Sequence, residues 1–291
     1  MATEKRCRKD RRDGYFLQEL DGYHVFLPYL MPNRADCEAF INEQVDLTNL
    51  LAYLEQKNAA NPGQRYTMFH VIAAAIAKTI TLRPQMNRFI SGKRIYQRKG
   101  ISLSFVAKKE FSDHGEEGLL YLPVGDEDTI DTIHAQIHNA VSEVRGGKTD
   151  NSIHFINILA KLPRWLLRLV MGILMWLDYH GHAPYELVKE DPNYSTVFIS
   201  NLGSIRLNAG YHHLNNWGNN SVFVVIGAKH KAPVFLEDNK FEVREVLNLG
   251  ITLDERIADG YYYSKTIRLL QHLLQNPVLL EQPLKEEVNY D

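Results

Sequence analysis

The residues best suited to chemistry lie near the C-terminus, in a stretch that reads LGITLDERIADG from residue 249 to residue 260. Apolar residues alternate with small ones at its start, which is typical of a strand. Charged residues follow the strand directly, and an acidic residue and a glycine close the turn: Asp254, Glu255, Arg256, Asp259 and Gly260. Charges at the end of a buried strand indicate a site. Taken alone, however, the pattern favours an ordinary strand–turn–helix junction with solvated charges over a site.

A second group of polar residues lies upstream. Ser200 and Asn201 end a predicted strand, and His212 and His213 follow in a loop. A hydroxyl can donate to an oxyanion, and an imidazole can accept a proton near neutral pH. Each residue also has an ordinary interpretation, since a strand-end serine bonds to the backbone and loop histidines pack or face solvent.

The order of these segments resembles the catalytic domain of the dihydrolipoyl acyltransferases of 2-oxo acid dehydrogenase complexes, and more distantly chloramphenicol acetyltransferase. In that superfamily a Phe-x-x-Ser-Asn-Leu-Gly strand precedes a terminal Asp-His-Arg-x-x-Asp-Gly motif. Residues 200–203 match the Ser-Asn-Leu-Gly of the first motif, and Phe198 precedes them in the same strand. Four residues match the second: Asp254, Arg256, Asp259 and Gly260. Glu255 stands where the family has its catalytic histidine.

The resemblance implies a fold and a set of roles. The fold is an α/β two-layer sandwich of the chloramphenicol acetyltransferase type, with a mixed sheet and packed helices, and the protein is expected to be a homotrimer with its site between subunits. Ser200 would donate to the tetrahedral oxyanion, and Arg256 and Asp259 would form an ion pair that shapes the turn. Gly203 and Gly260 would supply backbone freedom at sharp bends.

The identity of the base stays open. A free glutamate has a pKa of roughly 4.3, so Glu255 would need an apolar pocket to act as a base near neutral pH. His212 or His213 could replace the missing histidine, because the family has a loop there near the active-site channel. A catalytically silent relative is the third alternative.

Two hypotheses of function follow. The first is a free-standing acyltransferase that uses coenzyme A or acyl-coenzyme A as a substrate and moves the acyl group to a small thiol, hydroxyl or amine acceptor. The second is a silent homologue that binds an acyl carrier or assembles a complex. We expect no lipoyl-attachment domain in this chain and no metal at the site.

The composition is that of an ordinary globular protein. Hydrophobic residues make up 45% and charged residues 23% of the 291 residues, and the net charge of −2 gives no reason to expect nucleic acid as a partner. Two cysteines without paired spacing and an N-terminus without an apolar run fit a cytoplasmic protein. We expect a basic, solvated arm at residues 1–20 and one catalytic domain at residues 21–291.

Periodicity predicts the main elements. Strands are expected at residues 23–30, 38–45, 101–107 and 119–124, and a hairpin at 88–95. Helices are expected at residues 46–55, 67–82, 128–144 and 261–276. His70 is interpreted as a packed or capping residue. His134 and His138 share a helix face and are interpreted as a surface stripe rather than a metal pair, and the loop pair His180 and His182 is weak evidence for a metal.

An apolar insertion near residues 153–190 departs from the family pattern. Its central run is far shorter than the roughly 20 residues needed to cross a bilayer. Three interpretations are ranked: a helix buried at a subunit interface, a lid over an acyl channel, and an interfacial membrane helix. Burial ranks first because residues 162–177 are otherwise apolar all round and contain only two basic residues, Arg164 and Arg168.

Overall fold

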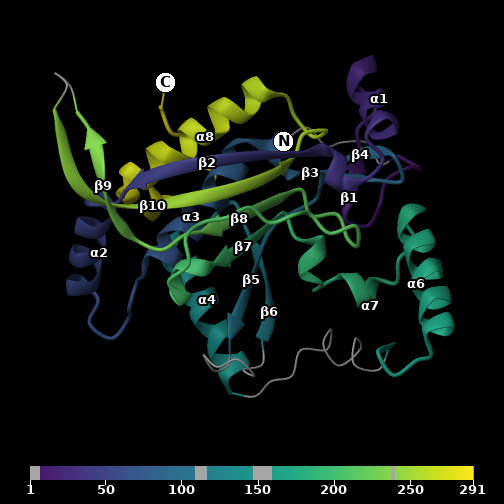
Figure 1. The fold of residues 1–291 in the computed structure, drawn as a ribbon, viewed down its shortest axis with the longest axis horizontal. Helices are drawn as coiled ribbons and strands as arrows, with labels where there is room; N and C mark the ends of the chain where they lie inside the picture. Colours follow the sequence, from purple (N-terminus) through teal and green to yellow (C-terminus); the bar gives the residue numbers. More distant parts are fainter. Residues whose placement is uncertain (1–6, 109–116, 147–158, 237–239, 291) are drawn as a thin grey trace.

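The fold is built on a mixed sheet of seven strands (Figure 1). The computed structural model describes residues 7–108, 117–146, 159–236 and 240–290. The strands lie in the order β2 (Glu38–Asp46), β10 (Phe241–Asp254), β8 (Val222–Ile226), β7 (Val197–Asn201), β5 (Ile101–Lys108) and β6 (Glu117–Val124), and β9 (His230–Phe235) pairs with the first half of β10. β7 runs parallel to both of its neighbours, and the other pairs are antiparallel.

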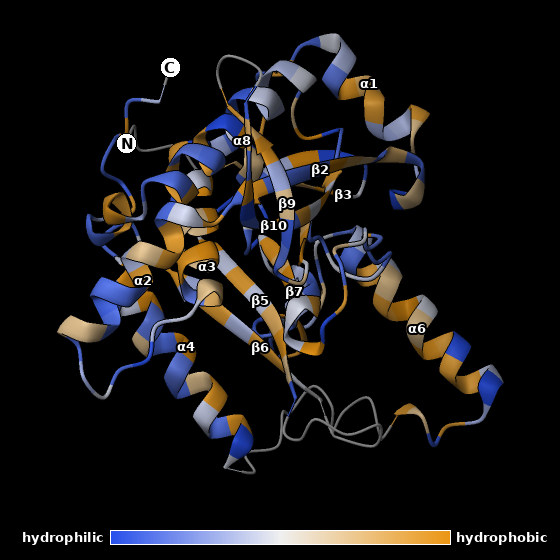
Figure 2. Cartoon of the chain, turned by 60° about the vertical axis from the view of Figure 1, so that its left-hand side comes forward, coloured by the Kyte–Doolittle hydropathy of each residue, from blue (hydrophilic) through white to orange (hydrophobic). Residues whose placement is uncertain are grey.

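One face of this sheet is covered by helices, which confirms the predicted two-layer sandwich (Figures 1 and 2). The covering helices are α2 (Thr48–Ala60), α3 (Met68–Leu82), α4 (Ile130–Arg145) and α8 (Gly260–Gln275). Alternate strand residues such as Leu249, Ile251 and Leu253 point into this layer and are 0–2% exposed. The intervening residues therefore point to the second face, where the candidate site residues lie.

Helix α3 is central in the helical layer because its alanine-rich middle lets neighbours approach closely. Its residues from Val71 to Ile80 are all buried. His70 caps the helix start, since the backbone N–H of Thr67 donates to His70 Nδ1 at 3.0 Å. The predicted capping role of this histidine is thus confirmed.

A small second sheet joins β1 (Gly14–Phe16), β4 (Arg94–Arg98) and β3 (Arg88–Ser91). The expected hairpin is present, with its turn at Gly92 and Lys93, both at positive φ. Residues 1–6 of the expected solvated arm lie outside the described part. The described part differs from the expectation, because β1 pairs with β4 and Arg11 is buried in an ion pair with Asp13.

The strand predicted for Tyr23 to Leu30 is wrong. The segment forms α1 (Gly22–Leu30), a helix that projects from the body (Figure 1). Asp21 caps it by accepting from the backbone N–H groups of Tyr23 and His24. A short apolar run has no clear period, so the cap is the feature that selects a helix.

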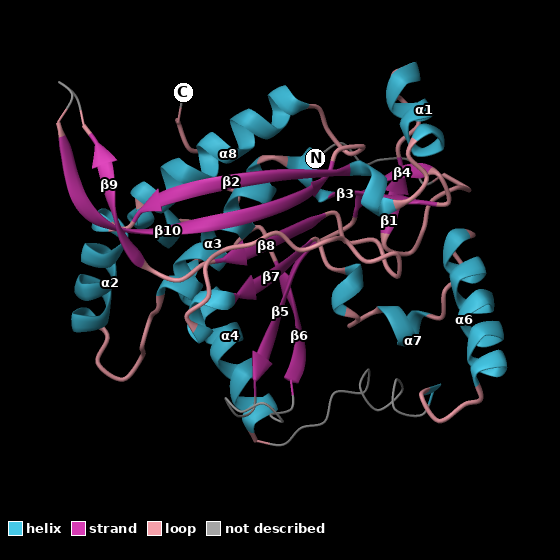
Figure 3. Ribbon diagram, viewed as in Figure 1, coloured by secondary structure: helices cyan, strands magenta, loops and turns pink. Residues whose placement is uncertain are grey.

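The apolar insertion contains α6 (Arg164–Tyr179), and the expected loop after it includes the short helix α7 (Tyr185–Val188). No residue of α6 is buried in the single chain, so burial within the subunit is excluded for this helix. Arg11 holds its C-terminal end by bonding the carboxylate and the carbonyl of Asp178. Figure 3 shows α6 standing apart from the sheet. Residues 153–158 of the predicted insertion lie outside the described part. Within the described ranges, no helix has the length and apolarity to cross a membrane.

The predicted surface stripe of His134 and His138 is wrong for the first of them. His134 is 4% exposed and stacks on Tyr66, with ring centroids 4.1 Å apart. An aromatic neighbour from another segment covers the imidazole, which the helix pattern alone does not reveal. Across the described residues, no group of three or more potential ligands is placed to hold a metal ion.

Candidate functional site

The end of β10 carries a buried ion pair. Arg256 reaches back to Asp254, with Nε to Oδ1 at 2.8 Å and Nη2 to Oδ2 at 2.7 Å, and Asp254 is fully buried. The expected pair of Arg256 with Asp259 is therefore wrong. Asp259 instead caps α8 by accepting from the backbone N–H of Tyr262 at 2.7 Å. The start of a helix explains this choice, because the first N–H groups have no partner within the helix.

Further buried groups surround this pair. Arg34 is 7% exposed and donates to the carbonyls of Gly218 and Asn220, and burial lowers its pKa despite the nearby charge of Asp254. Burial and the charge of Asp254 raise the pKa of the Cys37 thiol to about 12, so the thiol stays protonated. The hydroxyl of Tyr263 donates to the carbonyl of Asp254 at 2.8 Å and ties α8 to the turn.

Glu255 is exposed, although its chain neighbours Asp254 and Arg256 are buried. Its backbone N–H donates to the carbonyl of Cys37 at 2.9 Å, and the described residues contain no hydrogen-bond or ion-pair partner for its side chain. Gly260 follows with open space around it and without a positive φ. The expected backbone freedom at Gly260 is therefore not used. The buried pair of Asp254 and Arg256 thus supports a turn that directs the Glu255 carboxylate toward solvent.

Ser200 lies near the end of β7, on the sheet face opposite the helices. It pairs with Val225 of β8, which in turn pairs with Gly250 of β10. Asn201 starts a short turn by accepting from the backbone N–H of Ser204. Gly203 has no positive φ, but a Cβ there would lie 2.6 Å from the carbonyl oxygen of Gly227, so close packing requires this glycine.

The loop between β7 and β8 places two histidines on the sheet face that carries Ser200. The His212 ring is parallel to that of Phe223, with centroids 4.1 Å apart, and His213 stacks on His212. His212 Nδ1 lies 2.8 Å from the carbonyl oxygen of His213. Because a carbonyl only accepts, a neutral His212 has its proton on Nδ1 and a free lone pair on Nε2. This is the form that a base requires.

Paired residues of neighbouring strands form rows across the sheet, and the site groups occupy three such rows on this face. Ser200 is in the row of Val225 on β8. Phe223, which carries the stacked His212 ring, is two residues before Val225 on that strand, and Asp254 is in the row of Ser221, two residues before Phe223, where the Asp254 N–H donates to the Ser221 carbonyl. Four residues of strand span roughly 13 Å, and Asp254 is also two strands, or about 10 Å, across the sheet from Ser200. A single chain thus brings His212 over the row between Ser200 and Asp254, but it separates Ser200 from Glu255.

Sequence patterns did not reveal Arg34, Glu38 and Tyr263. Glu38 accepts from the backbone N–H of Leu214 and so anchors the histidine loop to β2. Tyr263 could have been found, because it follows Asp259 by one helical turn and faces the strand end. Arg34 and Glu38 carry no local signal, since β2 meets β10 only through the sheet pairing.

Comparisons with known proteins agree with this architecture. Residues 185–281 match the family described as 2-oxoacid dehydrogenases acyltransferase (catalytic domain). The chain is 23% identical over 239 residues to the lipoamide acyltransferase component of the branched-chain alpha-keto acid dehydrogenase complex of Bacillus subtilis (strain 168). That alignment covers 80% of this chain and 45% of the relative, so the chain spans less than half of the relative's length.

Solved structures show the same fold. A probable dihydrolipoamide acetyltransferase from Listeria monocytogenes 4b F2365 gives a TM-score of 0.60 at 17% identity, covering 94% of this chain and 98% of the other. The dihydrolipoamide acetyltransferase of Azotobacter vinelandii gives 0.60 at 15% identity, covering 91% and 93%. The matched sequence segment and the shared fold make this chain similar to the catalytic domains of the 2-oxo acid dehydrogenase acyltransferases.

Proposed function

We propose that the protein transfers acyl groups between coenzyme A and a small thiol acceptor of the dihydrolipoamide type, at a site shared by two copies of the chain in a homotrimer. The name of the Bacillus subtilis relative, a lipoamide acyltransferase component, supports this substrate class. In the Azotobacter vinelandii enzyme, a serine, a histidine and an asparagine have been investigated for their role in the catalytic mechanism, and its histidine and asparagine are four residues apart. Glu255 and Asp259 have the same spacing here.

The separation of Ser200 from Glu255 is the observation that carries the proposal. Both are accessible from outside the chain, yet their rows are too far apart for both residues to serve one reaction centre within a single chain. A second copy that lays its Glu255 turn against the Ser200 end would close this distance. Exposed apolar residues on α1 and on the β9–β10 hairpin, such as Phe26 and Phe235, give such a copy surfaces to cover.

The chemistry follows from the hydrogen bonds of one copy. His212 Nε2 takes the proton of the acceptor thiol, and the thiolate attacks the thioester carbonyl to form a new C–S bond. The Ser200 hydroxyl donates to the oxyanion of the tetrahedral intermediate. Collapse breaks the C–S bond to coenzyme A, whose sulfur takes the proton back from His212. Glu255 of a second copy would stabilise the imidazolium by its charge, because the His213 carbonyl already holds Nδ1–H.

Mixed assemblies test the shared site. Ser200→Ala and Glu255→Gln are each expected to lower the release of coenzyme A from acetyl-coenzyme A with dihydrolipoamide as acceptor. When the two variants are co-expressed and purified together, about one quarter of the sites in a cyclic assembly have both residues intact, and activity returns accordingly. If the site lay within one chain, no chain would be intact and the activity of the mixture would not exceed that of its parents.

The alternative, a catalytically silent homologue that binds an acyl carrier, is favoured by one observation: the Glu255 position. A glutamate stands where the resembled family has its catalytic histidine, and its side chain is exposed in the single chain. Wild-type protein that transfers no acyl group from any coenzyme A thioester, yet binds a lipoylated protein, would support this alternative over the proposal.

A further inference from the structure

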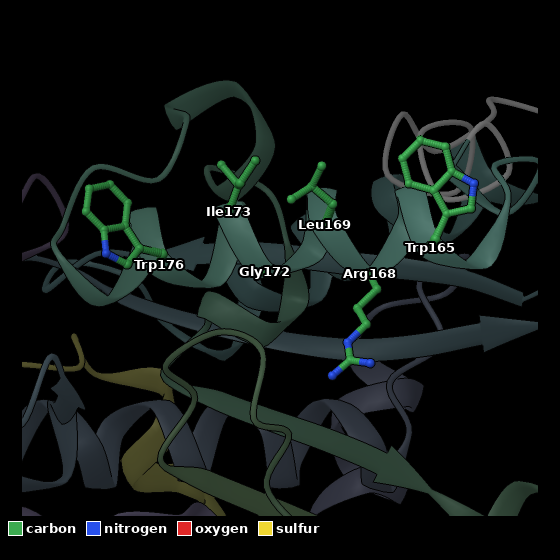
Figure 4. Close-up of a pocket in the computed structure, with 6 residues that line it drawn as sticks. All are labelled: Trp165, Arg168, Leu169, Gly172, Ile173 and Trp176. Carbon is green, nitrogen blue, oxygen red and sulfur yellow. The ribbon is translucent and has the colours of Figure 1, made fainter.

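The outward face of α6 is an apolar stripe. Trp165, Leu169, Ile173 and Trp176 are 70%, 54%, 50% and 60% exposed. Figure 4 shows these four side chains on the outward side of the helix, while Arg168 points the other way. Together with Arg168 and Gly172 they line a shallow depression on the helix surface. Large apolar side chains exposed in a continuous row mark a surface that another molecule covers.

Gly172 lies in the middle of this stripe. It has no positive φ, and a Cβ built at this position would meet nothing within 4 Å. Neither the backbone of α6 nor the rest of the chain therefore requires glycine, which is a poor helix former. A notch between Leu169 and Trp176 is useful only to a neighbour that inserts a side chain there.

The spacing of the stripe is self-complementary. Trp165, Leu169, Gly172 and Trp176 lie symmetrically about the midpoint between residues 170 and 171. A two-fold axis at that point places Leu169 of one helix opposite Gly172 of another, and Trp165 opposite Trp176. In a two-fold contact every pair of residues occurs twice, once in each direction, so the notches of both helices are filled.

We propose that α6 is an interaction surface for a second copy of this chain, and that two α6 helices pack antiparallel with Leu169 of each seated in the Gly172 notch of the other. Tryptophan is enriched among the residues that dominate protein interfaces. A lipid surface fits less well, because the glycine removes apolar area from the centre of the stripe and Arg168 points away from it.

This contact is separate from the shared active site. α6 stands apart from the sheet that carries Ser200 and the end of β10 (Figure 1). One helix stripe is small compared with a standard protein interface, so the contact is weak between single chains and gains strength when several copies act together. It would join the proposed trimers in pairs.

Sedimentation equilibrium of the full chain tests the proposal with two variants. Gly172→Leu fills the notch and should weaken the association on the order of tenfold, while improving helix propensity and apolarity. Leu169→Gly combined with Gly172→Leu exchanges knob and notch on both copies and should restore the association. The pair is matched, because the double variant keeps the residue composition of the wild type.

Each alternative outcome contradicts the proposal. An unchanged mass distribution for Gly172→Leu would overturn it. Stronger flotation of Gly172→Leu with vesicles containing phosphatidylserine, without a change in protein association, would make the membrane the partner. The orientation has its own test: a disulfide should form between Trp165→Cys and Trp176→Cys chains when they are mixed, and not within either variant alone. A disulfide in the Trp165→Cys variant alone would exclude the antiparallel arrangement.

Discussion

Arg256 bonds both carboxylate oxygens of Asp254, two residues before it, so the chain between them must turn outward at Glu255. The pair is buried while Glu255 is exposed. The ion pair therefore acts as the support of the turn rather than as part of its chemistry. Asp254 also faces the buried guanidinium of Arg34, so one carboxylate balances two cations.

Replacing Asp254 should be strongly destabilising. Asp254→Asn removes the carboxylate charge that Arg256 bonds and that Arg34 lies near, and breaking a buried pair costs about 3–5 kcal/mol. The matched control is Asp46→Asn, which removes the charge from a partly exposed pair with Arg244 and should cost less than about 1 kcal/mol. Urea unfolding measures both. Similar midpoints for the two variants would mean that the pair at Asp254 contributes little.

The position of the histidine loop depends on Gly250. A Cβ at this residue would lie 2.0 Å from the carbonyl oxygen of Gly210, so Gly250→Ala must displace the loop that carries His212. We expect a loss of about 1–3 kcal/mol in stability and lower acyl transfer. Gly210→Ala is the control, because its own Cβ would point into open space. Full activity of Gly250→Ala would show that the loop does not contribute to the site.

The sequence predicted the strand at Leu249–Leu253 because alternation records which face is buried. It could not predict the partner of Arg256, because Asp254 and Asp259 are both within reach along the chain. The choice depends on two facts of tertiary structure: Asp254 lies in the buried end of β10, and Asp259 is used by the first turn of α8. Such choices become visible only when the strand pairing is known.

The apolar segments show the same limit. Residues 23–30 and 162–177 are both apolar runs. The sequence predicted a strand for the first and, as the first-ranked interpretation, a helix buried at a subunit interface for the second. In the single chain the first forms the mostly exposed helix α1, and the second contains the exposed helix α6, whose cover by another subunit stays a prediction. Apolarity indicates that a segment is covered, but it does not say whether the covering surface belongs to the same chain.

Acid should destabilise the fold through His70. Burial, followed by the nearby His134 and His138, lowers the pKa of His70 to about 4. The unfolded chain, with a pKa near the ordinary value of 6.5, therefore binds more protons between these values. The stability contributed by neutral His70 is present above pH 6.5 and is lost as the pH falls toward 4. The acceptor role of Nδ1 toward Thr67 agrees with this sign, since a protonated ring cannot accept.

The variant His70→Gln isolates this effect. Glutamine can take the same capping position, because a Thr-x-x-Gln sequence also forms a capping box. We expect it to remove on the order of 2 kcal/mol of the stability change between pH 6.5 and 4, measured by urea unfolding at each pH. An identical pH dependence in wild type and variant would assign the acid sensitivity to other groups.

The contacts of the two histidines favour His212 over His213 as the base. His212 has Nδ1–H fixed by the His213 carbonyl and its ring held against Phe223. The His213 ring stacks on His212, and the described residues give it no hydrogen bond. His212→Gln should therefore lower acyl transfer by roughly a hundredfold to ten-thousandfold, and His213→Gln should have a small effect because its backbone carbonyl remains. Glu255→Gln should cause an intermediate loss, since it removes a charge but not the proton acceptor.

Full activity in both histidine variants together with an inactive Glu255→Gln variant would make Glu255 the base. Restored activity in a Glu255→His variant that also carries His212→Gln would show that the site accepts a base from either position.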